Sequence, residues 1–233
     1  MSLIGRHFNW FRNFGPYIVQ STISDELHQI LLGTANKIRK NKKLKLKNDY
    51  RHKLAGNLSE EYSYSGAFTD KEEFIVDQEL RWLASHFTKH SKQISGKDYS
   101  LEPNEILMQK PIWVNFMKQG EWNPVHNHTG DISCVTYLKV PKEIEEENRT
   151  SELSSKSNTP TAGKIEFQYG DHMDYCSTGV ILQPKEKDIY IFPATLQHMV
   201  YPFKSKTERI SVSVNFADKV KAYRNLNLNM PRR

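Results

Sequence analysis

The sequence predicts a mainly β protein with N-terminal helices, built as a double-sheet jelly roll. Two features support this class. Before residue 105 the apolar residues recur at helical spacing, whereas from Glu105 onward they fall in short runs of strand length. Helices first and many short strands afterwards favour two packed sheets backed by helices. We therefore expect a helical buttress with a basic segment over 1–104 and the jelly-roll domain over 105–233.

The composition is that of a globular chain. Its 233 residues are 37% hydrophobic, and the mean hydropathy of −0.68 indicates a polar exterior. The sequence contains no run of eighteen uncharged apolar residues, and its N-terminus lacks the apolar core of a signal peptide. We therefore expect a cytoplasmic protein without membrane contact. Cys134 and Cys176 are too few for a disulfide framework, so they are predicted to be free thiols.

The N-terminal segment is expected to hold one strand, over 15–20, and two helices. Ser24 offers an N-cap for a helix over 24–40, with two acidic residues in its first turn. A second helix is predicted over 70–91. The two predicted apolar faces are Leu27, Ile30, Leu31, Thr34, Ala35 and Ile38, and Phe74, Ile75, Leu80, Leu83, Ala84 and Phe87.

Much of the net charge of +6 comes from one basic run over 37–53. A solvated basic loop is the simpler interpretation of such a run, and electrostatic contact with nucleic-acid phosphates is the secondary one. The run consists of Lys37, Arg39, Lys40, Lys42, Lys43, Lys45, Lys47, Arg51 and Lys53.

Strand-length segments dominate the rest of the chain. The first spans 106–117 and contains Pro111, which indicates an edge strand or a bulge. Residues 142–162 are rich in Glu, Ser, Thr, Lys and Asn, so they are predicted to form a mobile insertion loop near the barrel mouth, where long loops often act as lids. The other predicted strands span 133–140, 164–168, 179–182, 188–192, 198–203 and 209–216.

Three histidines indicate a metal site. If the chain around His126 is a strand, His126 and His128 share a face and can chelate one ion. His198 follows another strand-like segment about 70 residues later, a separation typical of pairings within a β barrel. A lone buried histidine is usually structural, but two rings on one strand face have four nitrogens to satisfy. Imidazole binds Fe, Zn, Cu and Ni, so the pattern specifies the site better than its metal.

The third ligand has two candidates. An iron site of the two-His, one-carboxylate type needs a carboxylate, and Asp131 lies five residues beyond His126. Asp131 has the wrong strand parity and follows Gly130, so it reaches the metal only if the chain folds back there. We therefore expect His126, His128 and His198 as ligands, with Asp131 as the alternative third ligand.

Arg209 begins a strand-like run and is a candidate anion-binding residue. Strand alternation places Arg209 and Ser211 on one face. An arginine and a serine hydroxyl can clamp a ligand carboxylate in a geometry that lysine does not reproduce. The alternative is a surface salt bridge to Glu208 or another acid.

Over residues 113–216 the sequence resembles the iron(II)- and 2-oxoglutarate-dependent oxygenases, in particular an oxygenase group of marine bacteria and their phages that is distantly related to prolyl hydroxylases. The order and spacing of the motifs agree over about a hundred residues. The motifs are Trp113-Val-Asn, His126-Asn-His128 followed by Ser133-Cys-Val-Thr-Tyr-Leu, Gly163-Lys-Ile-Glu-Phe, Asp188-Ile-Tyr-Ile-Phe-Pro with His198, and Arg209-Ile-Ser-Val-Ser-Val-Asn.

The resemblance implies that the 105–233 domain is a double-stranded β-helix, a cupin-like jelly roll, and that it is the catalytic domain of a hydroxylase-type dioxygenase. Its implied cofactors are Fe(II) and 2-oxoglutarate, with ascorbate as an optional addition, and O2 as cosubstrate; succinate and CO2 would be the co-products. It further implies His126 and His198 as iron ligands and Arg209 with Ser211 as the binding site for the far carboxylate of 2-oxoglutarate, with Tyr137 and Asn115 lining the same pocket. The family usually carries Asp or Glu where this chain has His128, which leaves three possibilities: a three-His iron site, a site completed by Asp131 or water, or a binding fold that has lost catalysis.

Other interpretations remain open at the level of sequence. One is a three-His cupin-type dioxygenase that uses no 2-oxoglutarate, in which Arg209 would hold a substrate carboxylate. Another is a non-catalytic jelly-roll binding module. The substrate is expected to be a protein residue, a small molecule or, as the least favoured class, a nucleic acid.

Overall fold

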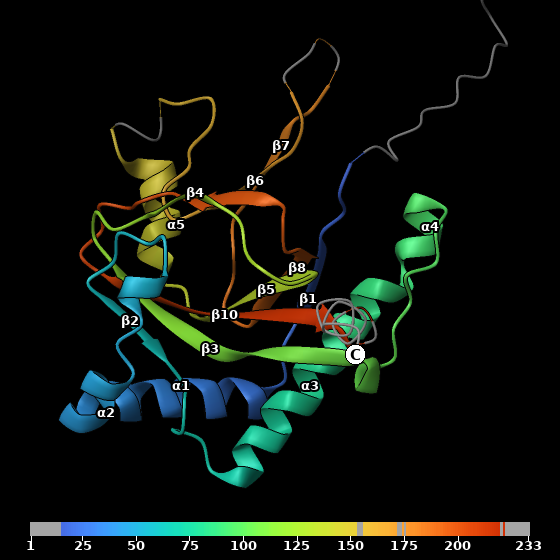
Figure 1. Ribbon diagram of the computed structural model, residues 1–233. Coiled ribbons are helices and arrows are strands. Elements are labelled where there is room, and N and C mark those ends of the chain that lie inside the picture. The colour runs from blue at the N-terminus through green and yellow to red at the C-terminus, as the bar shows by residue number, and fades with distance from the viewer. Residues whose placement is uncertain (1–14, 153–155, 172–173, 175, 220, 222–233) are drawn as a thin grey trace, which may run out of the picture.

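Two antiparallel sheets and two long helices make up the protein (Figure 1). The structure is a computed structural model, and it describes residues 15–152, 156–171, 174, 176–219 and 221. The larger sheet has the strand order β1-β8-β5-β10-β3-β2, and the smaller has the order β4-β9-β6-β7. The strands are β1 (Val19–Thr22), β2 (Glu60–Ser63), β3 (Ile106–Lys118), β4 (Asn123–His126), β5 (Ile132–Lys139), β6 (Ile165–Gln168), β7 (Gly179–Leu182), β8 (Asp188–Pro193), β9 (Gln197–Val200) and β10 (Glu208–Asp218).

Two apolar clusters hold the layers together. One lies between the larger sheet and the long helices α1 (Asp25–Lys40) and α3 (Asp70–Lys89), and includes Leu31, Leu80 and Val212. The other joins the inner faces of the two sheets and includes Tyr137, Phe167 and Phe192. The shorter helices are α2 (Lys42–Lys47), α4 (Ser91–Ser95), α5 (Lys142–Thr150), η1 (Arg51–Lys53) and η2 (Pro103–Glu105). The predicted jelly-roll class with N-terminal helices is confirmed.

The two predicted long helices are present and their caps explain where they begin. Ser24 accepts a hydrogen bond from Leu27 N, and Thr69 forms a capping box with Glu72. The prediction for α3 places one residue on the wrong face: Phe74 is 65% exposed, whereas Val76 is fully buried. No helix within the described ranges is long and apolar enough to cross a membrane.

Both edge strands of the larger sheet come from the segment predicted as a helical buttress. β1 pairs with β8, and β2 pairs with β3. The 1–104 segment therefore contributes two strands to the sheet as well as helices that cover it. The pairing of β10 with β3 shifts register between Ser213 and Asn215, opposite Pro111, so the bulge predicted there is confirmed.

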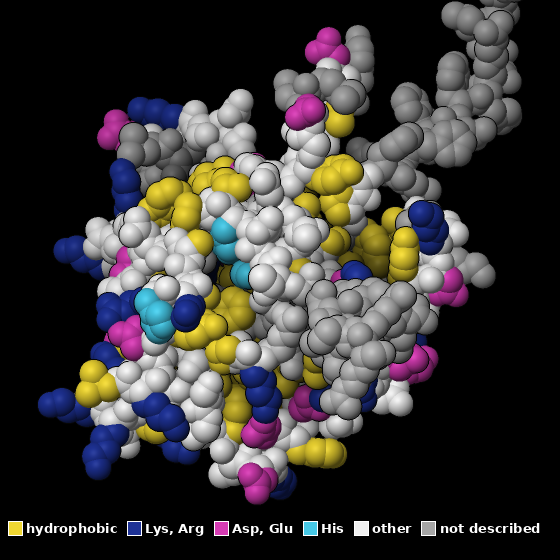
Figure 2. Space-filling view, viewed as in Figure 1, with side chains coloured by type: hydrophobic (Ala, Val, Ile, Leu, Met, Phe, Trp, Pro, Cys, Tyr) yellow, Lys and Arg dark blue, Asp and Glu magenta, His cyan; other side chains and the backbone are white. Residues whose placement is uncertain are grey.

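Part of the basic run is helical and ion-paired, so the prediction of a solvated loop is wrong. Asn41 caps α2 by accepting hydrogen bonds from Lys43 N and Leu44 N. Arg39 and Lys45 both bind the carboxylate of Glu60, and Arg51 binds Asp49. Figure 2 shows several Lys and Arg side chains at the lower left of the view, where Figure 1 places α2.

The predicted insertion loop begins with a packed helix. Ile144 of α5 is fully buried in the cluster between the sheets, and Asn148 donates to Ala162 O at 2.9 Å. Glu147 accepts hydrogen bonds from Lys204 N and Ser205 N. The mobile-loop prediction is therefore wrong for residues 142–150, because one apolar side chain and two backbone anchors hold this helix on the body of the protein. The stretch 153–155 lies outside the described residues.

Candidate metal centre

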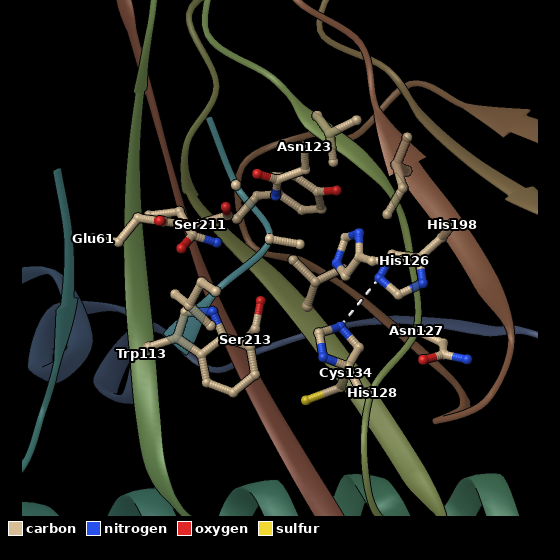
Figure 3. A pocket seen from close by; sticks show the side chains of 18 of the residues that line it. Glu61, Trp113, Asn123, His126, Asn127, His128, Cys134, His198, Ser211 and Ser213 are labelled. Atoms are coloured by element: carbon tan, nitrogen blue, oxygen red, sulfur yellow. Dashed lines mark hydrogen bonds between the residues drawn. The ribbon is translucent and has the colours of Figure 1, made fainter. Parts of the chain in front are cut away.

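Three histidines converge at the ends of two paired strands. His126 ends β4 and lies directly opposite His198 of β9. His128 follows two residues later, where its backbone N–H donates to Ala194 O at 2.8 Å. One ring nitrogen from each of the three histidines lies within 4.8 Å of the others. Figure 3 shows the three rings facing one another across a small space, as the sequence spacing predicts.

Backbone carbonyls set the orientation of two of these rings. The Nδ1 atom of His126 lies 2.7 Å from Pro124 O, and Nδ1 of His198 lies 2.9 Å from Leu196 O. A carbonyl only accepts, so Nδ1 must carry the proton in both rings and Nε2 keeps its lone pair. His128 Nε2 lies 3.1 Å from His198 Nε2. Two rings in fixed tautomers and three convergent ring nitrogens are typical of histidines that ligate a metal.

The electrostatics favour neutral imidazoles. Burial, together with the neighbouring rings, lowers the pKa of His128 to about 3, and burial lowers the pKa of His198 to about 4. The pKa of His126 is also lowered by burial. The three rings are therefore neutral at neutral pH, and no positive charge on them opposes the binding of an ion.

Asp131, the alternative third ligand, is turned away from the three histidines. Gly130 adopts a φ of +96°, and a Cβ there would lie 2.7 Å from Phe216 O, so only glycine fits this turn. Beyond the turn, Asp131 accepts a hydrogen bond from Asp218 N at 3.0 Å and pairs with Lys221. The structure thus brings His128, and not Asp131, to the other two histidines.

A row of polar side chains crosses the larger sheet beside the histidines. Ser211 of β10 lies opposite Asn115 of β3 on one side and opposite Tyr137 of β5 on the other. Residues that are opposite on adjacent strands point to the same face, so all three side chains line one cavity. Burial raises the pKa of Tyr137 to about 12, and its hydroxyl has no hydrogen-bond partner among the described residues.

Arg209 reaches the same cavity and is 2% exposed. It donates to Gly163 O at 2.7 Å and contacts Met117 Sδ at 2.9 Å, while its Nε has no partner among the described residues. No ion pair joins it to an acid in the described part of the chain, and Glu208 binds Arg39 instead. The alternative of a surface salt bridge is therefore wrong. A buried, unpaired guanidinium and a free tyrosine hydroxyl fit a carboxylate ligand, just as three neutral imidazoles fit a divalent transition metal.

The cavity that joins these groups has a volume of about 180 Å³. Trp113 lies against His128, with ring centroids 5.6 Å apart, and Phe192 lies against His198 at 4.8 Å. Aromatic rings therefore shield the histidines from water. Glu61 and Asn123 are among the polar residues of this cavity that sequence reasoning missed. The only available signal for Glu61 was the alternation of Tyr62 and Tyr64 with polar residues, which is typical of a strand.

A family of known proteins and several solved structures resemble this chain. Residues 111–215 match a family described as "Putative 2OG-Fe(II) oxygenase". A nogalamycin-biosynthesis epimerase, SnoN, described as a non-heme alpha-ketoglutarate-dependent enzyme, has a similar fold, with a TM-score of 0.54, 10% identity and coverage of 86% of this chain and 78% of that one. No curated protein matches the chain.

Two further solved structures have the same fold. A prolyl hydroxylase from Trichoplax adhaerens, in complex with a peptide of the hypoxia inducible factor, has a TM-score of 0.52 and 10% identity over 93% of this chain and 88% of that one. AviO1 from Streptomyces viridochromogenes has a TM-score of 0.51 and 10% identity over 86% and 89%. The segment that matches this family contains the three histidines and Arg209.

Proposed function

We propose that the chain binds Fe(II) through His126, His128 and His198 and uses 2-oxoglutarate and O2 to hydroxylate a substrate, with succinate and CO2 as co-products. One observation carries this proposal: three neutral imidazoles with convergent nitrogens share a cavity with a buried, unpaired arginine. The histidines would bind the metal, and Arg209 would bind the cosubstrate. Bound iron supplies the oxidising chemistry of such a site.

The cosubstrate end of the cavity is proposed to be Arg209 with Ser211, Tyr137 and Asn115. Arg209 Nε and Tyr137 Oη are buried donors without partners in the described structure. A ligand carboxylate would satisfy both, and burial would strengthen the interaction because water does not compete. Ser211 lies between Asn115 and Tyr137 in the register of the sheet, so its hydroxyl can reach the same ligand.

The histidines and the aromatic rings would perform two further tasks. The carbonyls of Pro124 and Leu196 hold the rings of His126 and His198, which fixes the direction of the lone pairs before the metal arrives. Trp113 and Phe192 exclude water from the ligands. No side chain is required as a general base in this proposal.

The third ligand distinguishes this site from a two-His, one-carboxylate site. Three neutral imidazoles leave the positive charge of the ion higher by one unit than a carboxylate-containing set does. The bound dicarboxylate would then neutralise the ion. We therefore expect metal affinity and 2-oxoglutarate affinity to be coupled, with each ligand strengthening the binding of the other.

Calorimetry tests this proposal without turnover. Titration of 2-oxoglutarate into the Mn(II)-loaded protein should give one binding site, and binding should weaken in metal-free protein. Absence of 2-oxoglutarate binding to the loaded protein would contradict the proposal. Release of succinate and CO2 from 2-oxoglutarate by the Fe(II)-loaded protein, with and without ascorbate, then tests the reaction itself.

A further inference from the structure

Glu61 extends the cosubstrate row by one strand. It lies on β2, directly opposite Asn115, which in turn lies opposite Ser211. Glu61 is 1% exposed and lines the same cavity as the histidines. Figure 3 shows Glu61 and the His126–His198 pair on opposite sides of that cavity. It lies outside the 111–215 segment that matches the family, so the family match assigns it no role.

The polar atoms around Glu61 are acceptors without donors. Glu61 Oε2, Asn115 Oδ1 and Asn123 Oδ1 are all buried, and none has a hydrogen-bond partner in the described structure. Gly56 covers this group closely, since a Cβ there would lie 2.6 Å from Glu61 Oε1 and 2.5 Å from Asn123 Oδ1. Buried acceptors without partners are costly, so this end of the cavity fits a ligand that brings hydrogen-bond donors.

Comparison with its neighbour shows that Glu61 is unusual. Glu60 is also buried, but Arg39, Lys45 and Lys118 all bind its carboxylate. Glu61 has no ion pair in the part of the chain that the structure describes. Burial, and then the charges of Glu121 and Asp49, raise the pKa of Glu61 to about 7, with only Arg51 opposing. Among the described residues, therefore, no cation forms an ion pair with Glu61, and the charge of Arg51 only partly offsets the effect of burial.

We propose that Glu61 is the substrate-binding residue of this cavity and that it accepts hydrogen bonds from a positively charged nitrogen group of the substrate, an ammonium or a guanidinium. A cation satisfies the carboxylate of Glu61, and its N–H groups satisfy Asn115 Oδ1 and Asn123 Oδ1, which leaves the amide N–H groups of Asn115 for the carboxylate of 2-oxoglutarate. The inference rests on the proposed function, because it assigns the histidine side of the cavity to the metal and the Arg209 end to 2-oxoglutarate. Glu61 then holds the substrate across the cavity from the metal.

Calorimetry with the Mn(II)- and 2-oxoglutarate-loaded protein tests this assignment. The probes are acetylated, amidated tripeptides of the form Ala-Xaa-Ala, where Xaa is lysine, arginine, citrulline, norleucine or glutamate. The lysine or arginine peptide should bind at least about tenfold more tightly than the neutral and acidic ones. Methylguanidine and n-butylamine distinguish the two sources of the cation: binding as tight as that of the peptides indicates a small-molecule amine, and weaker binding indicates a side chain of a peptide.

Variants then locate the effect. Glu61→Gln should weaken binding of the cationic peptide by about tenfold or more and leave the citrulline peptide unchanged. Glu121→Gln is the matched control, because Glu121 is a neighbouring acid that does not line the cavity. It should change cation binding by less than about threefold. Equal losses in both variants would show a long-range field in place of direct contact and would overturn the proposal.

Three further outcomes keep the test decisive. If Glu61→Gln fails to fold, calorimetry of the unaltered protein at pH 7 in two buffers of different ionisation enthalpy should show proton release with cationic probes only. Lys53 also lines the cavity and is exposed, so binding gained only in Lys53→Ala would show that this lysine occupies the subsite, and would overturn the proposal. Binding of 2-oxoglutarate without any preference for cationic probes would contradict the role of Glu61 and leave the proposed function intact.

Discussion

Arg209 and Glu61 are both buried charged side chains that line one cavity, yet they belong to different parts of the chain. Arg209 lies on β10, inside the segment that matches the oxygenase family, whereas Glu61 lies on β2, outside it. Neither has an ion-pair partner within the described residues, and their charges are opposite. The difference teaches that the wall of one cavity combines a strand from the segment that matches the oxygenase family with an edge strand, β2, that lies outside it.

The largest effect is expected at the metal. His128→Ala should weaken Mn(II) binding by at least about a hundredfold, because the substitution removes one of three ligand nitrogens. Calorimetry measures the affinity, and circular dichroism checks that the variant is folded. Unchanged affinity would show that the metal binds without His128, so the three histidines would not be the metal site of this cavity.

The next largest effect is expected on the unfolding free energy, through the titration of Glu61. Burial and nearby acids raise its pKa from 4.5 to about 7, so the folded protein binds this proton more tightly than the unfolded chain does. The contribution of Glu61 to the unfolding free energy should thus be full below about pH 4.5 and fall by up to about 3 kcal/mol as the pH rises through 7. Chemical denaturation at pH 5 and pH 8 checks this. Glu61→Gln should lack the decrease, and an identical pH profile for both proteins would contradict the raised pKa.

Arg209→Ala should weaken 2-oxoglutarate binding by about 2 kcal/mol and leave Mn(II) affinity unchanged, since Arg209 is proposed to contact the ligand and not the ion. Arg209→Lys is the informative companion, because it keeps the charge and loses the guanidinium geometry. Calorimetry on Mn(II)-loaded protein measures both variants. If 2-oxoglutarate binds Arg209→Ala as tightly as the unaltered protein, the cosubstrate end has been assigned wrongly.

The smallest effect is expected at Asp131. Asp131→Asn should change Mn(II) affinity by less than about twofold, because Asp131 faces Asp218 and Lys221 and not the histidines. Its unfolding free energy should decrease by about 1 kcal/mol or less, since the pair with Lys221 is largely exposed. A loss of metal affinity comparable with that of His128→Ala would instead support Asp131 as a ligand.

Much of the fold could be predicted from the sequence because its signals are local. The strand over 179–182 and the helix after Ser24 lie where the pattern of apolar residues and the capping residue place them. Helix α5 could not be predicted in this way, since in the described chain it buries only Ile144 and Asn148 and so has no apolar periodicity. Its stability comes from contacts with residues near 162 and 204, which are distant in sequence.

The candidate site also contains residues that local sequence signals predict and one that they do not. Strand parity and spacing predicted that His126, His128 and His198 would lie together, and a turn at Gly130 excludes Asp131 from that group. Glu61 could not be predicted, because a Glu-Glu pair normally indicates an exposed segment. Both acids are buried here for reasons that no local pattern contains: three basic residues from separate elements bind Glu60, and the cavity receives Glu61.

The edge strands of the larger sheet bear on how the protein folds. Val19 pairs with Ile191, so the first strand completes its hydrogen bonds only after most of the chain has been synthesised. Such long-range pairings slow folding and leave strand edges open to aggregation until they form. A fragment that starts at residue 105, where the apolar pattern changes, would lack both edge strands and Glu61. Residue 105 is therefore a poor boundary for a truncated protein, although the spacing of apolar residues changes there. N-terminal truncations should be tested first for solubility.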